Sequence, residues 1–194
     1  MIQMIRSKKD LAYYLNEDKK ALRCRTKRPR IGQDEIWRYQ ILLRKTEYYT
    51  NCKRGVFGKV LKLLYHYRYR RLGRKLGGFC ISPNSFGPGL SIAHWGAIVV
   101  HPNARIGKNC RIHEGVTIGA TNGSTDAAKI GDNVFIASGA KIIGGVTVAD
   151  DVAVGANAVV VKDIEEAGIT VGGVPAKKIS GNNSHANLSE MLVL

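Results

Sequence analysis

The stretch KIGDNVFIASGAKIIGGVTVADDVAVGANAVVV, residues 129–161, places an aliphatic or small residue at every sixth position. One such series consists of Val134, Ala140, Val146, Val152 and Ala158, and a second consists of Ile130, Ile136, Ile142, Val148, Val154 and Val160. Both series also run through residues 86–118. A repeat this regular indicates an architecture built by stacking similar units along one axis.

A period of six is neither the helical 3.6 nor the simple alternation of a strand. It describes a short strand and a tight turn, and three such units close a triangular coil whose neighbours stack about 4.8 Å apart. The sequence therefore predicts a mainly β fold, a left-handed parallel β-helix of hexapeptide repeats, with a short N-terminal α-helical region. The alternative, a β-sandwich with accidental spacing, does not explain why Ile118 and Ile130 lie two periods apart across a polar gap.

The charge of the chain is concentrated at its N-terminal end. Residues 1–76 contain 22 Lys and Arg against 6 Asp and Glu, a net charge of +16, whereas residues 77–194 contain 8 against 9, a net charge of −1. We therefore divide the chain into a basic α-helical N-terminal region (1–76), a β-helix domain (77–180) and a C-terminal tail (181–194). The tail is interpreted either as a short docking helix or as disorder.

The N-terminal region contains start and stop signals for three helices. Ser7 and Asp10 resemble a capping box at the start of the first helix, Asp34 is placed to cap a second, and a third is predicted from about Val56 towards Leu72. The third helix ends in a strongly basic stretch, residues 68–75.

Two interpretations of this basic region stay open. It is either a solvated helical cap on the β-helix, or a surface that attracts anionic lipid headgroups, a lipid-linked sugar or an acidic polymer. Nucleic acid is not expected, because no recognisable nucleic-acid motif accompanies the charge.

The cysteines and the hydropathy indicate the compartment. Cys24, Cys52, Cys80 and Cys110 have neither close pairing nor a metal-type spacing. The sequence has no apolar run of about 18 residues and no secretory signal pattern. We expect a reduced, cytoplasmic protein that could lie peripherally at the inner membrane.

Two interruptions of the repeat are candidates for a functional site. His94 stands in the strand segment that begins at Ile92, where the hexad phase would otherwise place an aliphatic residue. Its imidazole titrates near neutrality and could act as a general base, although a structural histidine is the plainer interpretation. The second interruption is the polar segment 119–129, which is predicted to leave the prism as a loop.

These residues, in this order, resemble the hexapeptide-repeat acyltransferases, and among them the serine O-acetyltransferase family. The resemblance rests on GPGLSIAHWGAIVV (87–100), GVTIG (115–119), KIGDNVFIASGAK (129–141) and VGGVPAK (171–177), and it covers roughly residues 78–180. It implies an acetyl-CoA-dependent acyltransferase that works as a homotrimer, with the donor in the groove between neighbouring subunits.

By that resemblance, His94 is the catalytic base and no metal is required. The cofactor-binding positions of the family fall on Ser138, Ala156, Lys162 and Lys177. Ser138 and the small Ala156 would let backbone groups meet the pantetheine amides, and the two lysines would face the phosphates of CoA. Both lysines could equally be solvated turn residues.

The chain also departs from the serine acetyltransferase pattern. Cys80 and Ala93 occupy positions where that family has acidic residues near its histidine, and the segment 119–129 lacks the family's Arg-His pair. These losses favour a sugar hydroxyl, in surface-polysaccharide biosynthesis, as the acceptor. Serine O-acetyltransferase, making O-acetyl-L-serine for cysteine biosynthesis, is the alternative.

The group that orients His94 is left open by the sequence. A backbone carbonyl is the simplest candidate, and His101, His113 and Glu114 are side-chain candidates from adjacent coils. Two other functions are possible. A γ-type carbonic anhydrase would need zinc-binding histidines at a spacing that is absent here, and a basic scaffold without catalysis would not need His94 at all.

Overall fold

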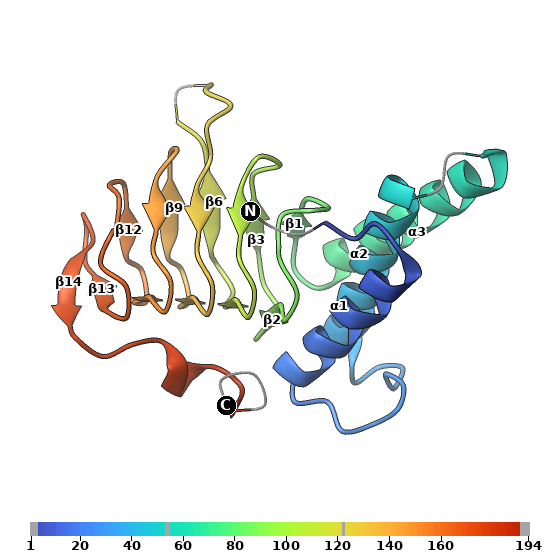
Figure 1. Ribbon diagram of the computed structural model, residues 1–194, viewed down its shortest axis with the longest axis horizontal. Helices are drawn as coiled ribbons and strands as arrows, with labels where there is room; N and C mark the ends of the chain where they lie inside the picture. The colour runs from blue at the N-terminus through green and yellow to red at the C-terminus, as the bar shows by residue number, and fades with distance from the viewer. Residues whose placement is uncertain (1–3, 53–54, 122, 191–194) are drawn as a thin grey trace.

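The computed structural model describes residues 4–52, 55–121 and 123–190. A β prism fills most of the molecule, and a group of helices stands at the end where the prism begins (Figure 1). This arrangement confirms the predicted left-handed parallel β-helix with N-terminal helices.

The helices lie close to their predicted places. They are α1 (Lys8–Ala21), α2 (Glu35–Cys52) and α3 (Val56–Lys75). Ser7 caps α1, since its hydroxyl accepts a hydrogen bond of 3.0 Å from the Asp10 N–H. Asp34 directly precedes α2, and its carbonyl oxygen accepts the N–H of Arg38 at 3.0 Å, while its carboxylate accepts the N–H of Arg30 at 2.8 Å and closes the preceding loop.

The prism has three parallel sheets. The first consists of β1 (Phe79–Ile81), β3 (Ile98–Val100), β6 (Thr117–Gly119), β9 (Lys141–Ile143) and β12 (Val159–Val160). The second consists of β4 (Arg105–Ile106), β7 (Lys129–Ile130) and β10 (Thr147–Val148). The third consists of β2 (Ser91–Ile92), β5 (Arg111–Ile112), β8 (Phe135–Ile136), β11 (Ala153–Val154), β13 (Thr170–Gly172) and β14 (Lys177–Ser180). Of the strands in the described part of the chain, only β14 pairs antiparallel, and it closes the third sheet.

The strand register explains how the repeat survives the polar segment. Ile130 pairs with Val148, which is 148 − 130 = 18 residues later, and this is one regular coil. Ile106 pairs with Ile130, which is 130 − 106 = 24 residues later. The coil that contains the polar segment is therefore one hexad longer than a regular coil, so the inward residues return in phase.

The inward series forms one continuous core, in which Ile106, Ile112, Ile118, Ile136 and Ile142 have no exposed surface. The turns are held by a ladder of side chains with left-handed backbone. Asn109 donates to Asn133 at 2.8 Å, and Asn133 donates to Asp151 at 2.9 Å, one coil after another. Asn and Asp tolerate this backbone region better than other non-glycine residues, which explains their place in the repeat.

A buried ion cluster fastens the helices to the first coil of the prism. Arg44 of α2 has no exposed surface, and it contacts Asp18 of α1 at 2.8 Å and Glu47 at 3.1 Å. Its guanidinium also donates to the carbonyl oxygens of Phe86 and Gly87. The cluster therefore fixes the start of the segment that leads into β2 and His94.

The C-terminal tail returns along the prism to the helices (Figure 1). It contains the short 3₁₀ helix η1 (His185–Asn187) and buries Leu188. Arg23 donates to the carbonyl of Leu188 at 2.9 Å, and the Ser189 hydroxyl donates to the carbonyl of Lys20 at 3.0 Å. In its described part the tail thus docks on the end of α1, while residues 191–194 lie outside the described residues.

Candidate active site

One corner of the prism brings together several of the predicted site residues. His94, Glu114, Ser138 and Ala156 each lie two residues after a strand of the third sheet, and these strands, β2, β5, β8 and β11, pair in that order. The four residues therefore stack along one edge of the prism, one per coil. We call this row the His94 column.

At the end of the column nearest the helices, the side chains of His94, His113 and Glu114 are close to one another. One ring nitrogen of His94, one ring nitrogen of His113 and one carboxylate oxygen of Glu114 lie within 4.8 Å of one another. The rings of His94 and His113 meet edge to face, with centroids 5.1 Å apart, and Ser138 Oγ lies 3.4 Å from His113 Nδ1. His94 is exposed, whereas His113 and Glu114 are half-buried.

The side chains of Glu114 and His113 differ in charge at neutral pH. A hydrogen bond from the Ser138 hydroxyl lowers the pKa of the Glu114 carboxyl, and the rings of His94 and His113 lower it further, so this carboxylate is ionised at neutral pH. Burial and the nearby Arg111 guanidinium lower the pKa of His113, which is therefore neutral near pH 7. A neutral ring and an anionic carboxylate thus flank His94.

Two atoms of the cluster are buried and have no hydrogen-bond partner among the described residues: Nε2 of His113 and one carboxylate oxygen of Glu114. Buried polar groups are nearly always satisfied, so these atoms are open to a water, a ligand or a neighbouring molecule. His113 and Glu114 were two of the candidates for orienting His94, and the structure places them beside it. The third, His101, lies at another corner, where its Nδ1 accepts the N–H of Asn103.

The remaining predicted cofactor residues lie apart from the end of the column nearest the helices. Lys162 is exposed and follows β12, at the corner between the first and second sheets. Lys177 is exposed at the start of β14, where it pairs with Gly172. Of the four predicted cofactor positions, the structure therefore stacks only Ser138 and Ala156 with His94.

The polar segment leaves the prism as a loop, as expected, but it does so at a different corner from His94. It follows β6, and Asn103 donates to the carbonyl of Thr125 at 2.8 Å, which ties the loop to the turn before β4. Figure 1 shows this loop standing out from the body of the prism. The His94 segment and the loop follow each other in the sequence, but within one chain they lie at different corners of the prism.

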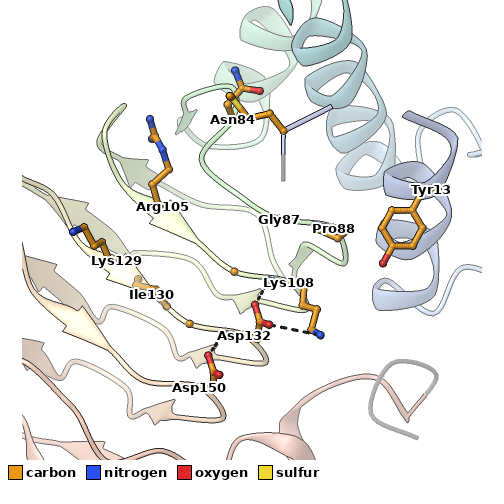
Figure 2. A pocket seen from close by; sticks show the side chains of 13 residues that line it. Tyr13, Asn84, Gly87, Pro88, Arg105, Lys108, Lys129, Ile130, Asp132 and Asp150 are labelled. Atoms are coloured by element: carbon orange, nitrogen blue, oxygen red, sulfur yellow. Dashed lines mark hydrogen bonds and ion pairs between the residues drawn. The ribbon is translucent and has the colours of Figure 1, made fainter. Parts of the chain in front are cut away.

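A cavity of about 810 Å³ lies elsewhere, between α1 and the second sheet. Figure 2 shows Tyr13 on one side of it and Arg105, Lys129 and Lys108 on the other. Its acidic groups already have partners, since Asp132 accepts the N–H of Lys108 at 2.9 Å. None of the predicted site residues lines this cavity, so volume alone does not mark the active site of this protein.

Comparison with known proteins bears on the fold and the family of the chain. The family model described as bacterial transferase hexapeptide (six repeats) matches residues 127–162. A serine acetyltransferase of Helicobacter pylori (strain J99) is 37% identical over 113 residues, covering 57% of this chain and 66% of that protein.

Two solved structures share the fold. A serine acetyltransferase of Neisseria gonorrhoeae in complex with serine is 26% identical, with a TM-score of 0.64, over 90% of this chain and 71% of that one. A serine acetyltransferase in complex with CoA is 24% identical, with a TM-score of 0.63, over 89% of this chain and 71% of that one, and this likeness shows the fold alone.

The coiled prism and the match of residues 127–162 to the bacterial transferase hexapeptide model together identify a hexapeptide-repeat fold. The chain is similar to the hexapeptide-repeat acyltransferases, and among them to the serine O-acetyltransferases. It spans just under two thirds of the Helicobacter relative's length.

Proposed function

We propose that the protein is an acetyl-CoA-dependent O-acetyltransferase that uses His94 as its general base. The observation that carries the proposal is the His94 column, in which the candidate base is stacked with Glu114 and with two positions expected to bind the donor. The names of the relatives support acetyl transfer as the reaction. Because acetyl-CoA is made and used in the cytoplasm, we also propose that the enzyme works there.

The proposed reaction is a direct transfer. His94 accepts the proton of the acceptor hydroxyl while the oxygen attacks the thioester carbonyl carbon. The tetrahedral oxyanion needs a hydrogen-bond donor, for which a backbone N–H of the site is the simplest candidate. As the C–S bond breaks, the imidazolium returns its proton to the CoA thiolate, so protons and charge balance without a metal.

The acceptor we now favour is L-serine. The relatives are named serine acetyltransferase, and this supports serine as the acceptor better than the sugar hydroxyl that the sequence alone favoured. One observation keeps the sugar as a second candidate: between Gly119 and Ala128 the sequence offers no Arg, Lys or His to meet an amino-acid carboxylate. Lys129, at the end of the loop, is the nearest basic residue in the sequence.

A homotrimer would complete this site. Within one chain, His94 and the loop that follows β6 occupy different corners, with the first sheet between them. A site that needs both must therefore be assembled between subunits, as the resemblance to hexapeptide-repeat acyltransferases implies. In that arrangement Lys162 or Lys177 could face the phosphates of a donor bound along the His94 column.

An acceptor screen with acetyl-CoA decides the substrate class. We expect L-serine to release free CoA thiol faster than UDP-sugars and simple glycosides do, with D-serine as a matched control that keeps the functional groups and changes only their geometry. Thiol release can be followed by a chromogenic disulfide reagent. Turnover of a sugar in preference to L-serine would reverse the acceptor assignment and leave the acetyl-transfer proposal intact.

Substitution of Glu114 tests whether this carboxylate positions His94. We expect Glu114→Gln to lower kcat by about 10-fold to 100-fold with little change in KM, because a neutral amide no longer stabilises a charged imidazole beside it. For the same reason the acidic limb of the pH–rate profile should move to lower pH. Glu114→Asp should restore part of the rate.

The outcome that contradicts this role is a Glu114→Gln enzyme with the wild-type rate and pH profile. Metal analysis of the same preparations tests whether the site binds a metal ion, since His94, His113 and Glu114 are close enough together to hold a small cation. Zinc bound stoichiometrically to the wild type and lost from Glu114→Gln would replace the proton-transfer proposal by a metal-dependent one.

A further inference from the structure

Helix α3 has one face that packs against the body of the protein. Tyr65 stacks on Tyr49 of α2, with ring centroids 5.2 Å apart and nearly parallel planes. Tyr69 is buried and donates to the carbonyl of Ile81 at 3.3 Å. Gly73 lies so close to the Phe79 carbonyl that an added Cβ would come within 2.8 Å of it. These contacts fix the orientation of the helix.

The opposite face of the first half of α3 is apolar and exposed. The exposed fractions are 76% for Phe57, 58% for Val60, 71% for Leu63, 45% for Leu64 and 55% for Tyr67. Each of these residues lies three, four or seven positions from at least two others in the group, so they lie on one side of the helix. An exposed apolar patch of this kind usually marks a surface that binds something else.

The same helix is strongly basic. It carries Lys59, Lys62, Arg68, Arg70, Arg71, Arg74 and Lys75, and its sequence contains no Asp or Glu. By helical phase, Arg70, Arg71 and Arg74 continue the exposed apolar side towards the C-terminal end of α3. The outer side of α3 is therefore apolar in its first half and cationic in its second.

We propose that the outer side of α3 binds an anionic membrane surface, with Phe57, Leu63 and their neighbours inserted among the headgroups. Exposed apolar residues combined with Lys and Arg are the composition of interfacial helices. Anionic lipids attract such basic segments within about a Debye length. A second copy of the protein is not expected to bind this face of α3, because the two faces are both cationic and would repel each other.

The position of α3 fits this role. In Figure 1 the start of α3 projects beyond α1, at the end of the molecule away from β14. Among the described residues, none of the helices has the length and hydropathy needed to cross a membrane, so contact would be confined to the surface. This inference does not depend on the identity of the acceptor.

The test is flotation of the full chain with vesicles. We expect binding to vesicles that contain phosphatidylglycerol, little binding to vesicles of phosphatidylcholine alone, and weakening at high salt. The double variant Phe57→Ser/Leu63→Ser should bind at least about tenfold more weakly, because it removes two inserted side chains. Arg70→Gln and Arg71→Gln should each weaken binding about fivefold.

Ile31→Ser is the matched control, since Ile31 is 85% exposed, apolar and in a basic neighbourhood but outside α3. It should bind as the wild type does. Circular dichroism and acetyl transfer in solution report whether the variants are folded. Equal binding to both vesicle types, or undiminished binding by the double variant, overturns the proposal. So does a loss of self-association in the double variant with no vesicle binding by the wild type, which would make this face a contact between copies.

Discussion

Replacement of His94 by alanine should lower the rate of acetyl transfer by about 10²-fold to 10⁴-fold, the range for losing a general base. The methyl group of alanine cannot accept the proton of the acceptor hydroxyl, so the attack on the thioester loses its assistance. The measurement is thiol release from acetyl-CoA at saturating acceptor. Because His94 is exposed, the substitution should leave the fold and the binding of CoA close to those of the wild type.

Two controls make the His94 result specific. His66→Ala removes a histidine of α3 that packs edge to face on Tyr69, with centroids 5.2 Å apart and far along the chain from the column, and it should retain the rate. Binding of CoA, followed by thermal shift, separates loss of chemistry from loss of the site. An unchanged rate in His94→Ala would favour the scaffold interpretation, in which the protein has no catalytic histidine.

The core of the fold could be predicted because its signal is periodic. From Ile106 to Val160 the inward residues keep the six-residue spacing and are buried. The spacing fails in the first coil, where Ile92 pairs with Ile112, 112 − 92 = 20 residues later, so His94 lies exposed at a corner and not at the inward position that the hexad phase predicted.

The helix caps were harder to predict because they depend on side-chain geometry: the Ser7 hydroxyl accepts the N–H of Asp10 at the start of α1, whereas the Asp34 carboxylate, just before α2, accepts the N–H of Arg30 in the preceding loop. Local patterns thus predicted which elements form better than they predicted how the elements end.

The site was only partly predictable because the coils differ in length. His94 and Glu114 are stacked although they are 114 − 94 = 20 residues apart, two more than a regular coil of about eighteen would place between them. The sequence therefore could not show that Glu114, rather than His101, lies beside His94. The position of the loop after β6 could not be predicted either. Its sequence follows the His94 segment closely, but in the fold it lies at another corner of the prism.

The cluster around Arg44 was not predicted at all. Its partners, Asp18 and Glu47, are separated from one another and from Phe86 by stretches with no periodic relation. A single arginine in a region with 22 basic residues carries no signal in the sequence, and only burial distinguishes it from a surface residue. The N-terminal region therefore contains a structural cation as well as the exposed ones that we expect to meet lipid.

Substitution of Arg44 by methionine should lower the free energy of unfolding by about 3–5 kcal/mol, the range for breaking a buried ion pair by removing one partner. Methionine keeps much of the side-chain volume but removes every donor, so Asp18 and Glu47 are left buried without a countercharge, and the carbonyls of Phe86 and Gly87 lose their donor. Urea unfolding followed by circular dichroism measures the change. Arg38→Met, which removes a partly exposed pair with Glu35, is the matched control and should cost less than about 1 kcal/mol.

The pH dependence of the Arg44→Met deficit distinguishes lost charge compensation from lost packing. Burial already raises the pKa of Glu47 in the wild type, against the opposing effect of Arg44, and without Arg44 this pKa should rise further. A carboxyl whose pKa is higher in the folded state than in the unfolded state contributes relative stability as pH falls, because the folded protein then binds the proton more tightly. The deficit should therefore shrink between pH 8 and pH 5, about the range over which a buried carboxyl can titrate. A deficit that stays constant across this range would mean that packing, and not the uncompensated carboxylates, accounts for the loss.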